Sequence, residues 1–122
     1  MLAALSGTPY YPDFTGSILF LEDIGEEPYK LDRLFSTLKL NGTLDKIRGF
    51  VFGQCTSCDP SGGYGSLTLD ELVDDYILPL GVPAYRGAMI GHVNKQFFIP
   101  IGAEATLDAD RGTLTLSSPL FL

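Results

Sequence analysis

Two apolar runs without alternating polar residues stand in the first half of the chain, at residues 17–21 (SILFL) and Gly49–Gly53 (GFVFG). Such runs are typical of strands that are buried on both faces of a parallel sheet. Between them, apolar residues recur at helical spacing: Leu31, Leu34, Phe35 and Leu38. Pro28 suits the first turn of this helix, and Gly42 supplies the positive φ that ends one. Residues 17–53 therefore predict a parallel βαβ unit with a right-handed crossover.

A second helix is predicted to follow Thr68. Thr68 and Glu71 have the spacing of a capping box, and Pro79 limits the helix to about Leu78. The side chains that recur on one face of this helix form its predicted buried stripe: Leu69, Leu72, Val73, Tyr76 and Ile77.

The last third of the chain changes pattern. A short strand is expected near residues 84–86, and apolar and polar residues then alternate through 104–108 and 113–116. With a turn at 110–112, this alternation predicts a β-hairpin that has one face in water. Together these elements predict an α/β domain with a parallel βαβ core and a C-terminal β-hairpin.

Length, composition and charge exclude several classes of protein. The 122 residues suffice for one domain, and 45% of them are hydrophobic, which excludes a disordered chain. No apolar run approaches the roughly 18 residues of a membrane span, and residues 1–11 lack the pattern of a secretory signal. Fifteen acidic and eight basic residues give a net charge of −7, which argues against nucleic acid and membrane surfaces as partners.

The first residues indicate that the chain comes from a longer protein. Residues 1–14 contain Gly7, Pro9 and Pro12, which favour extended or turning backbone over a helix. The apolar residues 1–5 have no predicted partner, so we expect a longer sequence to have covered them.

The candidate catalytic residues are acids at a strand end and the only histidine. Glu22 and Asp23 directly follow the first predicted strand, and His92 lies between Gly91 and Val93 after a later one. Ligands of open α/β sheets collect at such strand ends, and an acid that orients an imidazole is two thirds of a hydrolase triad. Two other interpretations stay open, because acids also stabilise helix starts and a single histidine is often a surface residue. No G-x-S-x-G nucleophile motif occurs.

Only one of the two acids can face the histidine. Successive side chains of a strand point to opposite sides, so Glu22 and Asp23 should diverge. We expect Glu22, which continues the strand, to face His92, and Asp23 to interact with the start of the helix.

Cys55 and Cys58 form a C-x-x-C pair in the predicted loop 54–66. Half a zinc site or a redox pair would fit this spacing, but zinc needs four ligands and there is no second C-x-x-C. We predict two ordinary loop thiols that are dispensable for the fold, no metal, and a reducing compartment. The glycine-rich stretch 62–65 could hold a phosphate but lacks the Lys-Ser/Thr ending of a P-loop, so a flexible loop is expected.

Most of the chain resembles the carboxyl-terminal half of LD-carboxypeptidases, the muramoyltetrapeptide carboxypeptidases. The resemblance runs through residues 7–53, with LFLED and PYKLDR as specific parts, then through PLGVPAYRGAMIGHV and ATLDADRGTLTL. It implies a small swivelling β/β/α domain of a two-domain serine peptidase that removes the terminal D-alanine from murein tetrapeptide in the cytoplasm. A related branch of the family hydrolyses an aminoacyl-nucleotide peptide antibiotic.

The same resemblance implies that Glu22 is the triad acid and His92 the triad base. The family's nucleophilic serine lies in an amino-terminal domain that has no counterpart here, so residues 1–122 are expected to be the C-terminal domain alone and inactive by itself. The implied partners are murein peptide and the missing domain, with no cofactor, and a homodimer is left open. The alternatives are a non-catalytic interaction module that keeps the fold, or the matching domain of an antibiotic-peptide immunity hydrolase.

Overall fold

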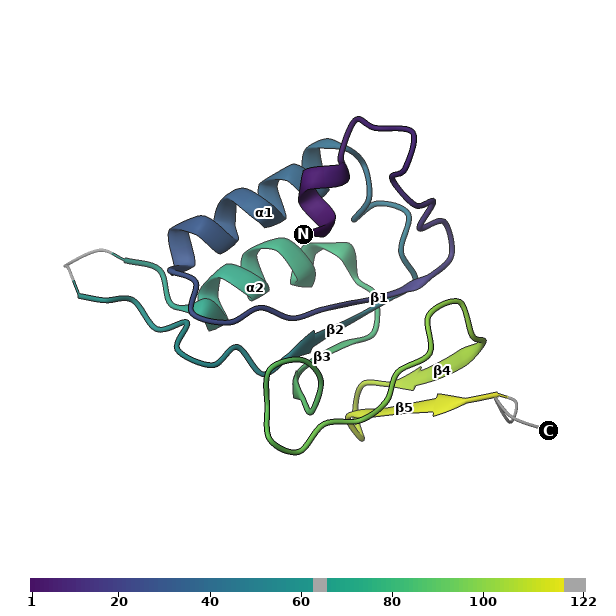
Figure 1. Cartoon of the computed structure of the whole chain (residues 1–122). Helices are drawn as coiled ribbons and strands as arrows, with labels where there is room; N and C mark the ends of the chain where they lie inside the picture. Colours follow the sequence, from purple (N-terminus) through teal and green to yellow (C-terminus); the bar gives the residue numbers. More distant parts are fainter. Residues whose placement is uncertain (63–65, 118–122) are drawn as a thin grey trace.

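The computed structural model of the chain describes residues 1–62 and 66–117 (Figure 1). Three parallel strands form one sheet in the order β1-β2-β3, and β4 and β5 form a separate antiparallel hairpin. None of the helices in this part of the chain has the length and hydropathy to cross a membrane. The elements are, in order, η1 (Leu2–Leu5), β1 (Ile18–Leu21), α1 (Pro28–Leu40), β2 (Gly49–Gly53), α2 (Leu69–Ile77), η2 (Leu78–Leu80), β3 (Ala84–Ala88), β4 (Ala105–Asp108) and β5 (Thr113–Leu116).

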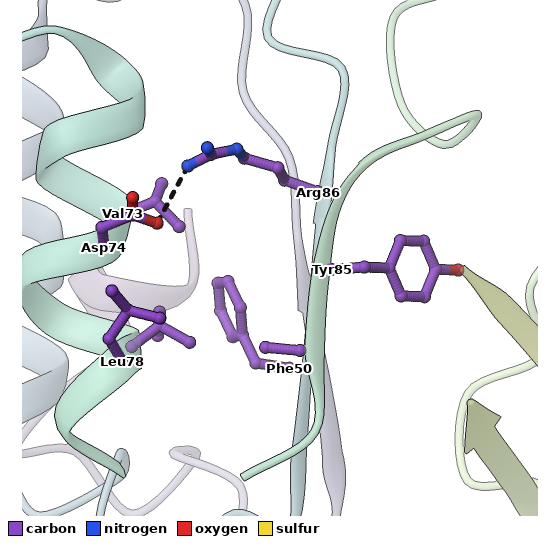
Figure 2. A pocket seen from close by; sticks show the side chains of 8 residues that line it. Phe50, Val73, Asp74, Leu78, Tyr85 and Arg86 are labelled. Carbon is purple, nitrogen blue, oxygen red and sulfur yellow. Dashed lines mark hydrogen bonds and ion pairs between the residues drawn. The ribbon is translucent and has the colours of Figure 1, made fainter. Parts of the chain in front are cut away.

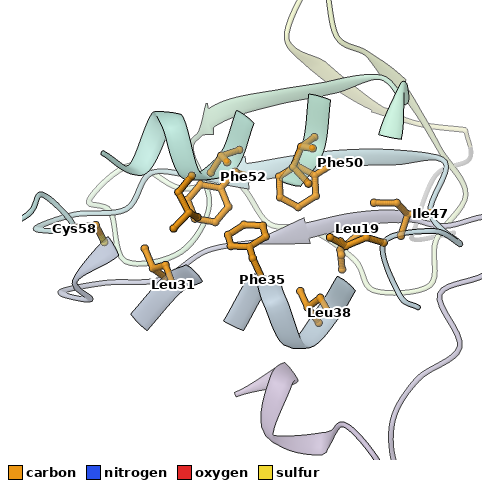
Figure 3. Close-up of a cluster of buried hydrophobic side chains, with 12 residues drawn as sticks. Leu19, Leu31, Phe35, Leu38, Ile47, Phe50, Phe52 and Cys58 are labelled. Atoms are coloured by element: carbon orange, nitrogen blue, oxygen red, sulfur yellow. The ribbon is translucent and has the colours of Figure 1, made fainter. Parts of the chain in front are cut away.

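Both α-helices lie on the same face of the parallel sheet (Figure 1). Because strand order equals chain order, both crossovers advance in the same direction, and crossovers of one hand then put their helices on one face. Figure 3 shows the buried side chains that meet between helices and sheet. The rings of Phe50, Phe52 and Tyr76 have centroids 6.1, 5.9 and 5.4 Å from that of Phe35, which makes Phe35 a centre of this core.

The two predicted buried strands differ in burial. All five residues of β2 are buried, as its apolar run predicts. In β1 only Leu19 is buried, because β1 is an edge strand with a single neighbour. Burial of residues 17–21 on both faces is therefore a wrong prediction, whereas the parallel βαβ unit is confirmed by the pairing of Leu19 with Phe50.

The predicted hairpin is confirmed and packs against the face of the sheet opposite the helices. Leu107 in β4 lies so close to Gly49 that a Cβ added at Gly49 would be 2.7 Å from Leu107 Cδ2. Figure 2 shows the Tyr85 ring directed away from α2 and toward the hairpin. Within the hairpin, Leu107 pairs with Leu114, and the alternating threonines face water.

The first residues of the chain are more ordered than their composition predicts. Leu2–Leu5 forms a 3₁₀ helix, so the expectation of non-helical backbone is wrong there. Leu2 packs against the core, and Asn41 Nδ2 donates a hydrogen bond to Ser6 Oγ at 2.9 Å. These contacts anchor a segment that local composition marks as irregular.

The predicted capping box starts α2. Thr68 Oγ1 accepts a hydrogen bond from the Glu71 N–H at 3.2 Å, and Glu71 Oε2 accepts one from the Thr68 N–H at 2.8 Å. The backbone and hydroxyl hydrogen bonds from Thr68 hold the pKa of the Glu71 carboxyl below its ordinary value of 4.5.

We expect Thr68→Ala to lower the free energy of unfolding by about 1 kcal/mol. The contribution of Glu71 should depend on pH, because its pKa is lower in the folded chain than in the unfolded one. The stabilisation by Glu71 is fully present at pH values above the pKa that its carboxyl has in the unfolded chain. It is lost as the pH falls through the lower pKa of the folded chain. Urea titrations at pH 7 and pH 3 should show Glu71→Gln destabilising the chain more at pH 7 than at pH 3. Asp75→Asn removes one negative charge from the same helix and serves as the charge control. If Glu71→Gln lowered the free energy of unfolding equally at both pH values, this reasoning would be contradicted.

Candidate active site

The two predicted catalytic residues, far apart in sequence, lie together at one edge of the sheet. Glu22 follows β1 and His92 follows β3, and parallel strands end at the same edge. Glu22 Oε2 is 2.9 Å from His92 Nδ1, across a separation of 70 residues in the sequence. The structure thus brings together the acid and the imidazole that the sequence analysis selected.

Backbone hydrogen bonds hold the turn that carries His92. The Val93 N–H donates to the Gly91 carbonyl at 3.0 Å, which closes a tight turn around His92. The Phe97 N–H donates to the Met89 carbonyl at 2.8 Å and closes the loop that contains this turn. The imidazole is therefore supported by a folded loop.

The contact between Glu22 and His92 determines what the imidazole can do. A carboxylate that accepts the Nδ1–H leaves the lone pair of the neutral ring on Nε2, where it can take a proton. The His92 side chain is 58% exposed and that of Glu22 27%, so the ring is open to an approaching group. Within residues 1–62 and 66–117, His92 makes its only side-chain hydrogen bond to Glu22, so in the described part of the chain the imidazole has no hydroxyl partner.

Asp23 has a different environment. Its Oδ1 accepts a hydrogen bond from the Ile24 N–H at 2.9 Å. The N-cap of α1 is Glu27, so the expected interaction of Asp23 with the helix start is wrong. The chain bends at residue 25, before the helix begins, and the hydrogen bond of Asp23 lies next to this bend.

Sequence reasoning missed Gly53, the last residue of β2. It lies between the two outer strands, and a Cβ there would be 2.9 Å from Glu22 Cβ. The available signal was a glycine at the end of an apolar run, next to the edge where the site residues were expected.

The two cysteines form a disulfide, which corrects the prediction of two loop thiols. Cys58 is buried in the core between the helices and the sheet, and Thr56 between the cysteines pairs with Ile24, two residues after Glu22.

Residues 1–62 and 66–117 contain no group of three or more His, Cys, Asp or Glu side chains arranged to hold a metal. The stretch considered for phosphate, 62–65, falls outside the described residues except at its first position.

We expect a chelator to leave the melting temperature of the chain unchanged. A thiol reductant should lower it by several degrees without unfolding the chain at room temperature, because a disulfide that closes so short a loop contributes about 2 kcal/mol through chain entropy. The Cys55→Ser/Cys58→Ser variant should not respond to reductant. A large loss of melting temperature on chelation would instead indicate a bound metal.

A pocket of about 240 Å³ between α2 and β3 is a weaker candidate (Figure 2). The Arg86 guanidinium reaches across it to Asp74, with Nη1 at 3.0 Å from Oδ1, and its Nε lies 3.3 Å from Asp70 Oδ1. The remaining lining includes Phe50 and Val73. Because the charge of Arg86 is already paired, we interpret the residues that line this pocket as a contact that links α2 to β3.

A larger hollow of about 600 Å³ lies beside the site. It is lined by Met89 and Ile90, which lead to Gly91 and His92, together with residues 97–100 and the hairpin. Phe97 is 64% exposed and Phe98 89% exposed, so this surface presents aromatic side chains to solvent.

Comparison with known proteins identifies the same family for nearly the whole chain. The profile described as the LD-carboxypeptidase C-terminal domain matches residues 1–107. The chain is 37% identical over 118 residues to a Bacillus subtilis protein named "Probable murein peptide carboxypeptidase", covering 97% of this chain and 37% of that protein. It is 30% identical over 96 residues to the murein tetrapeptide carboxypeptidase of Pseudomonas aeruginosa, covering 79% of this chain and 31% of that protein. It thus spans about a third of the length of these curated relatives.

Solved structures share the fold. The muramoyltetrapeptide carboxypeptidase of Oxalobacter formigenes superposes with a TM-score of 0.83 at 32% identity, covering 95% of this chain and 41% of that one. The Microcin C7 self-immunity protein MccF, solved with aspartyl sulfamoyl adenosine, also gives a TM-score of 0.83, over 97% of this chain and 35% of that one. At 24% identity this second likeness shows the fold alone. The α/β architecture with a parallel core and a hairpin is confirmed by the first.

Proposed function

The chain belongs to the LD-carboxypeptidase family, as its C-terminal domain, and from this premise we propose that it supplies Glu22 and His92 to a Ser-His-Glu triad. The serine would come from a part of the relatives' length that these 122 residues do not span. The proposed reaction is removal of the terminal D-alanine from murein tetrapeptide, in the cytoplasm. The observation that carries the proposal is the 2.9 Å contact between Glu22 Oε2 and His92 Nδ1 at the end of the parallel strands.

In the proposed mechanism His92 acts first as a base and then as an acid. Nε2 takes the proton of the serine hydroxyl as its oxygen attacks the carbonyl carbon before D-alanine, and Glu22 stabilises the imidazolium that forms. When the C–N bond breaks, Nε2–H returns the proton to the leaving amine. Water, deprotonated by the same imidazole, then releases the acyl group from the serine.

The aromatic surface beside the site supports a partner domain there. Phe97 and Phe98 are exposed, and the hollow they line reaches Ile90, two residues before His92. Contiguous exposed apolar side chains usually mark an interaction surface. A nucleophile domain docked on it would cover these rings and bring a serine to the exposed side of the imidazole.

A chimera tests the proposal. Residues 1–122 would replace the matching segment of the Bacillus subtilis relative, which is 37% identical, and D-alanine release from murein tetrapeptide would be measured. We expect the chimera to release D-alanine, His92→Ala to abolish the release, and the separate 122-residue chain to release none. The unmodified relative and the chimera's melting curve serve as controls.

Three results would contradict the proposal. These are release that survives His92→Ala, release by the separate chain, and a folded chimera inactive on murein tetrapeptide. The chain is also 28% identical to the Microcin C7 self-immunity protein MccF of Escherichia coli, so an aminoacyl sulfamoyl nucleotide is assayed in parallel. Cleavage of that compound alone would favour the immunity-hydrolase alternative, and cleavage of neither would favour a non-catalytic module.

A further inference from the structure

The carboxylate of Glu22 must cross the end of the central strand to reach His92. Glu22 follows β1, His92 follows β3, and β2 lies between these two strands. The last residue of β2 is Gly53. A side chain at the end of β2, or in the turn before His92, would therefore compete with Glu22 for the same space.

Gly91, directly before His92, leaves room for the Glu22 carboxyl group. A Cβ added at Gly91 would lie 2.6 Å from Glu22 Cγ and would overlap Oε2, the same oxygen that contacts His92 Nδ1. The three atoms nearest to that Cβ all belong to Glu22. Gly91 also has φ +89°, a conformation that side-chain-bearing residues rarely adopt.

Gly53 leaves room for the other end of the same side chain. A Cβ there would lie 2.9 Å from Glu22 Cβ and 2.8 Å from Ile90 Cγ1. Such distances are shorter than real Cβ contacts, so Glu22 or Ile90 would have to move. The two glycines thus leave space for the Glu22 side chain, Gly53 next to its Cβ and Gly91 next to its carboxyl group.

We infer that Gly91 and Gly53 are positioning residues that hold the Glu22 carboxylate against His92 Nδ1. A methyl group at Gly91 displaces the carboxylate, Nδ1 loses its acceptor, and the neutral imidazole no longer keeps its proton on Nδ1. The effect on catalysis rests on the proposed function, whereas the effect on the imidazole concerns this chain alone.

The chain offers a clean readout, because His92 is its only histidine. Nitrogen-15 NMR of the imidazole in the 122-residue chain distinguishes the two neutral tautomers. We expect the Nδ1–H tautomer in the wild type, and we expect Gly91→Ala to have the tautomer ratio of Glu22→Ala, which removes the acceptor altogether. Gly102→Ala is the matched control, because Gly102 has φ +81° and nothing within 4 Å of an added Cβ, so it carries the backbone strain without the clash.

A double-mutant cycle separates this role from general folding. Glu22→Ala removes the Glu22 atoms that crowd Gly91, so Gly91→Ala should lower the melting temperature less in that background than in the wild type. The remaining loss should equal that of Gly102→Ala. If Gly91→Ala alone does not fold, recovery of folding in the double variant supports the inference, and failure of both overturns it.

In the active chimera, Gly91→Ala should lower kcat about as much as Glu22→Gln does, with little change in KM. A wild-type tautomer ratio in Gly91→Ala, or an additive cycle, would overturn the inference. If Gly91→Ala shifts the tautomer ratio but the chimera is inactive, the inference about Gly91 is supported. That result would count against the proposed function only.

Discussion

Glu22→Gln is expected to lower kcat of the active chimera by about a hundredfold or more while the domain stays folded. In the proposed triad, the carboxylate at 2.9 Å from His92 Nδ1 would fix the tautomer and stabilise the imidazolium, and a neutral amide would do neither as well. Since the lost interaction is needed mainly in the transition state, the change should fall on kcat more than on KM. Steady-state kinetics of the chimera on murein tetrapeptide measure both constants.

Asp23→Asn is the matched control for this prediction. Asp23 accepts a hydrogen bond from the Ile24 N–H, and an asparagine side-chain oxygen can accept the same bond. Its kcat should stay close to that of the parent chimera, with a loss of stability below about 1 kcal/mol. A large kinetic loss in Asp23→Asn with a normal Glu22→Gln would mean that the wrong acid has been assigned.

Phe35→Ala is expected to cost about 3–5 kcal/mol of the free energy of unfolding. Phe35 is 2% exposed, and its ring packs among Phe50, Phe52 and Tyr76, so truncation leaves a cavity between helix and sheet. Domains of this size have about 5–15 kcal/mol in total, so the variant should be close to unfolding. Urea titration followed by circular dichroism measures the loss.

Leu40→Ala on the same helix provides the control. Leu40 is 86% exposed, and its truncation should change the free energy of unfolding by about 0.5 kcal/mol or less. Equal losses in the two variants would show that the packing around Phe35 does not carry the stability described above.

The elements that depend on local pattern could be predicted from the sequence. The spacing of Leu31 and Phe35 gives the helix α1, the capping box at Thr68 gives the start of α2, and the alternation around Leu107 gives the hairpin. Each of these patterns is complete within a short window, so no knowledge of the rest of the fold is needed.

Features that depend on distant neighbours were missed. The incomplete burial of β1 follows from its place at the sheet edge, and the 3₁₀ helix at Leu2–Leu5 follows from contacts with the core. The choice of Glu22 and His92 came from strand ends and family resemblance, whereas the need for Gly53 arises only when β1 and β3 flank β2. The disulfide also depends on loop geometry that the C-x-x-C spacing alone does not determine.

The strand order β1-β2-β3 has a consequence for the order of folding events. Residues 18–53 contain β1, α1 and β2, so this unit can form through contacts that are short in sequence. The contact between Glu22 and His92 spans 70 residues and requires β3 to dock on β2 first. A chain that has completed only the first crossover therefore has much of its aromatic core but no acid–imidazole pair. In a refolding experiment, burial of the Phe35 ring should precede the change at the imidazole, because the site is assembled from the two outer strands and forms only when the sheet is complete.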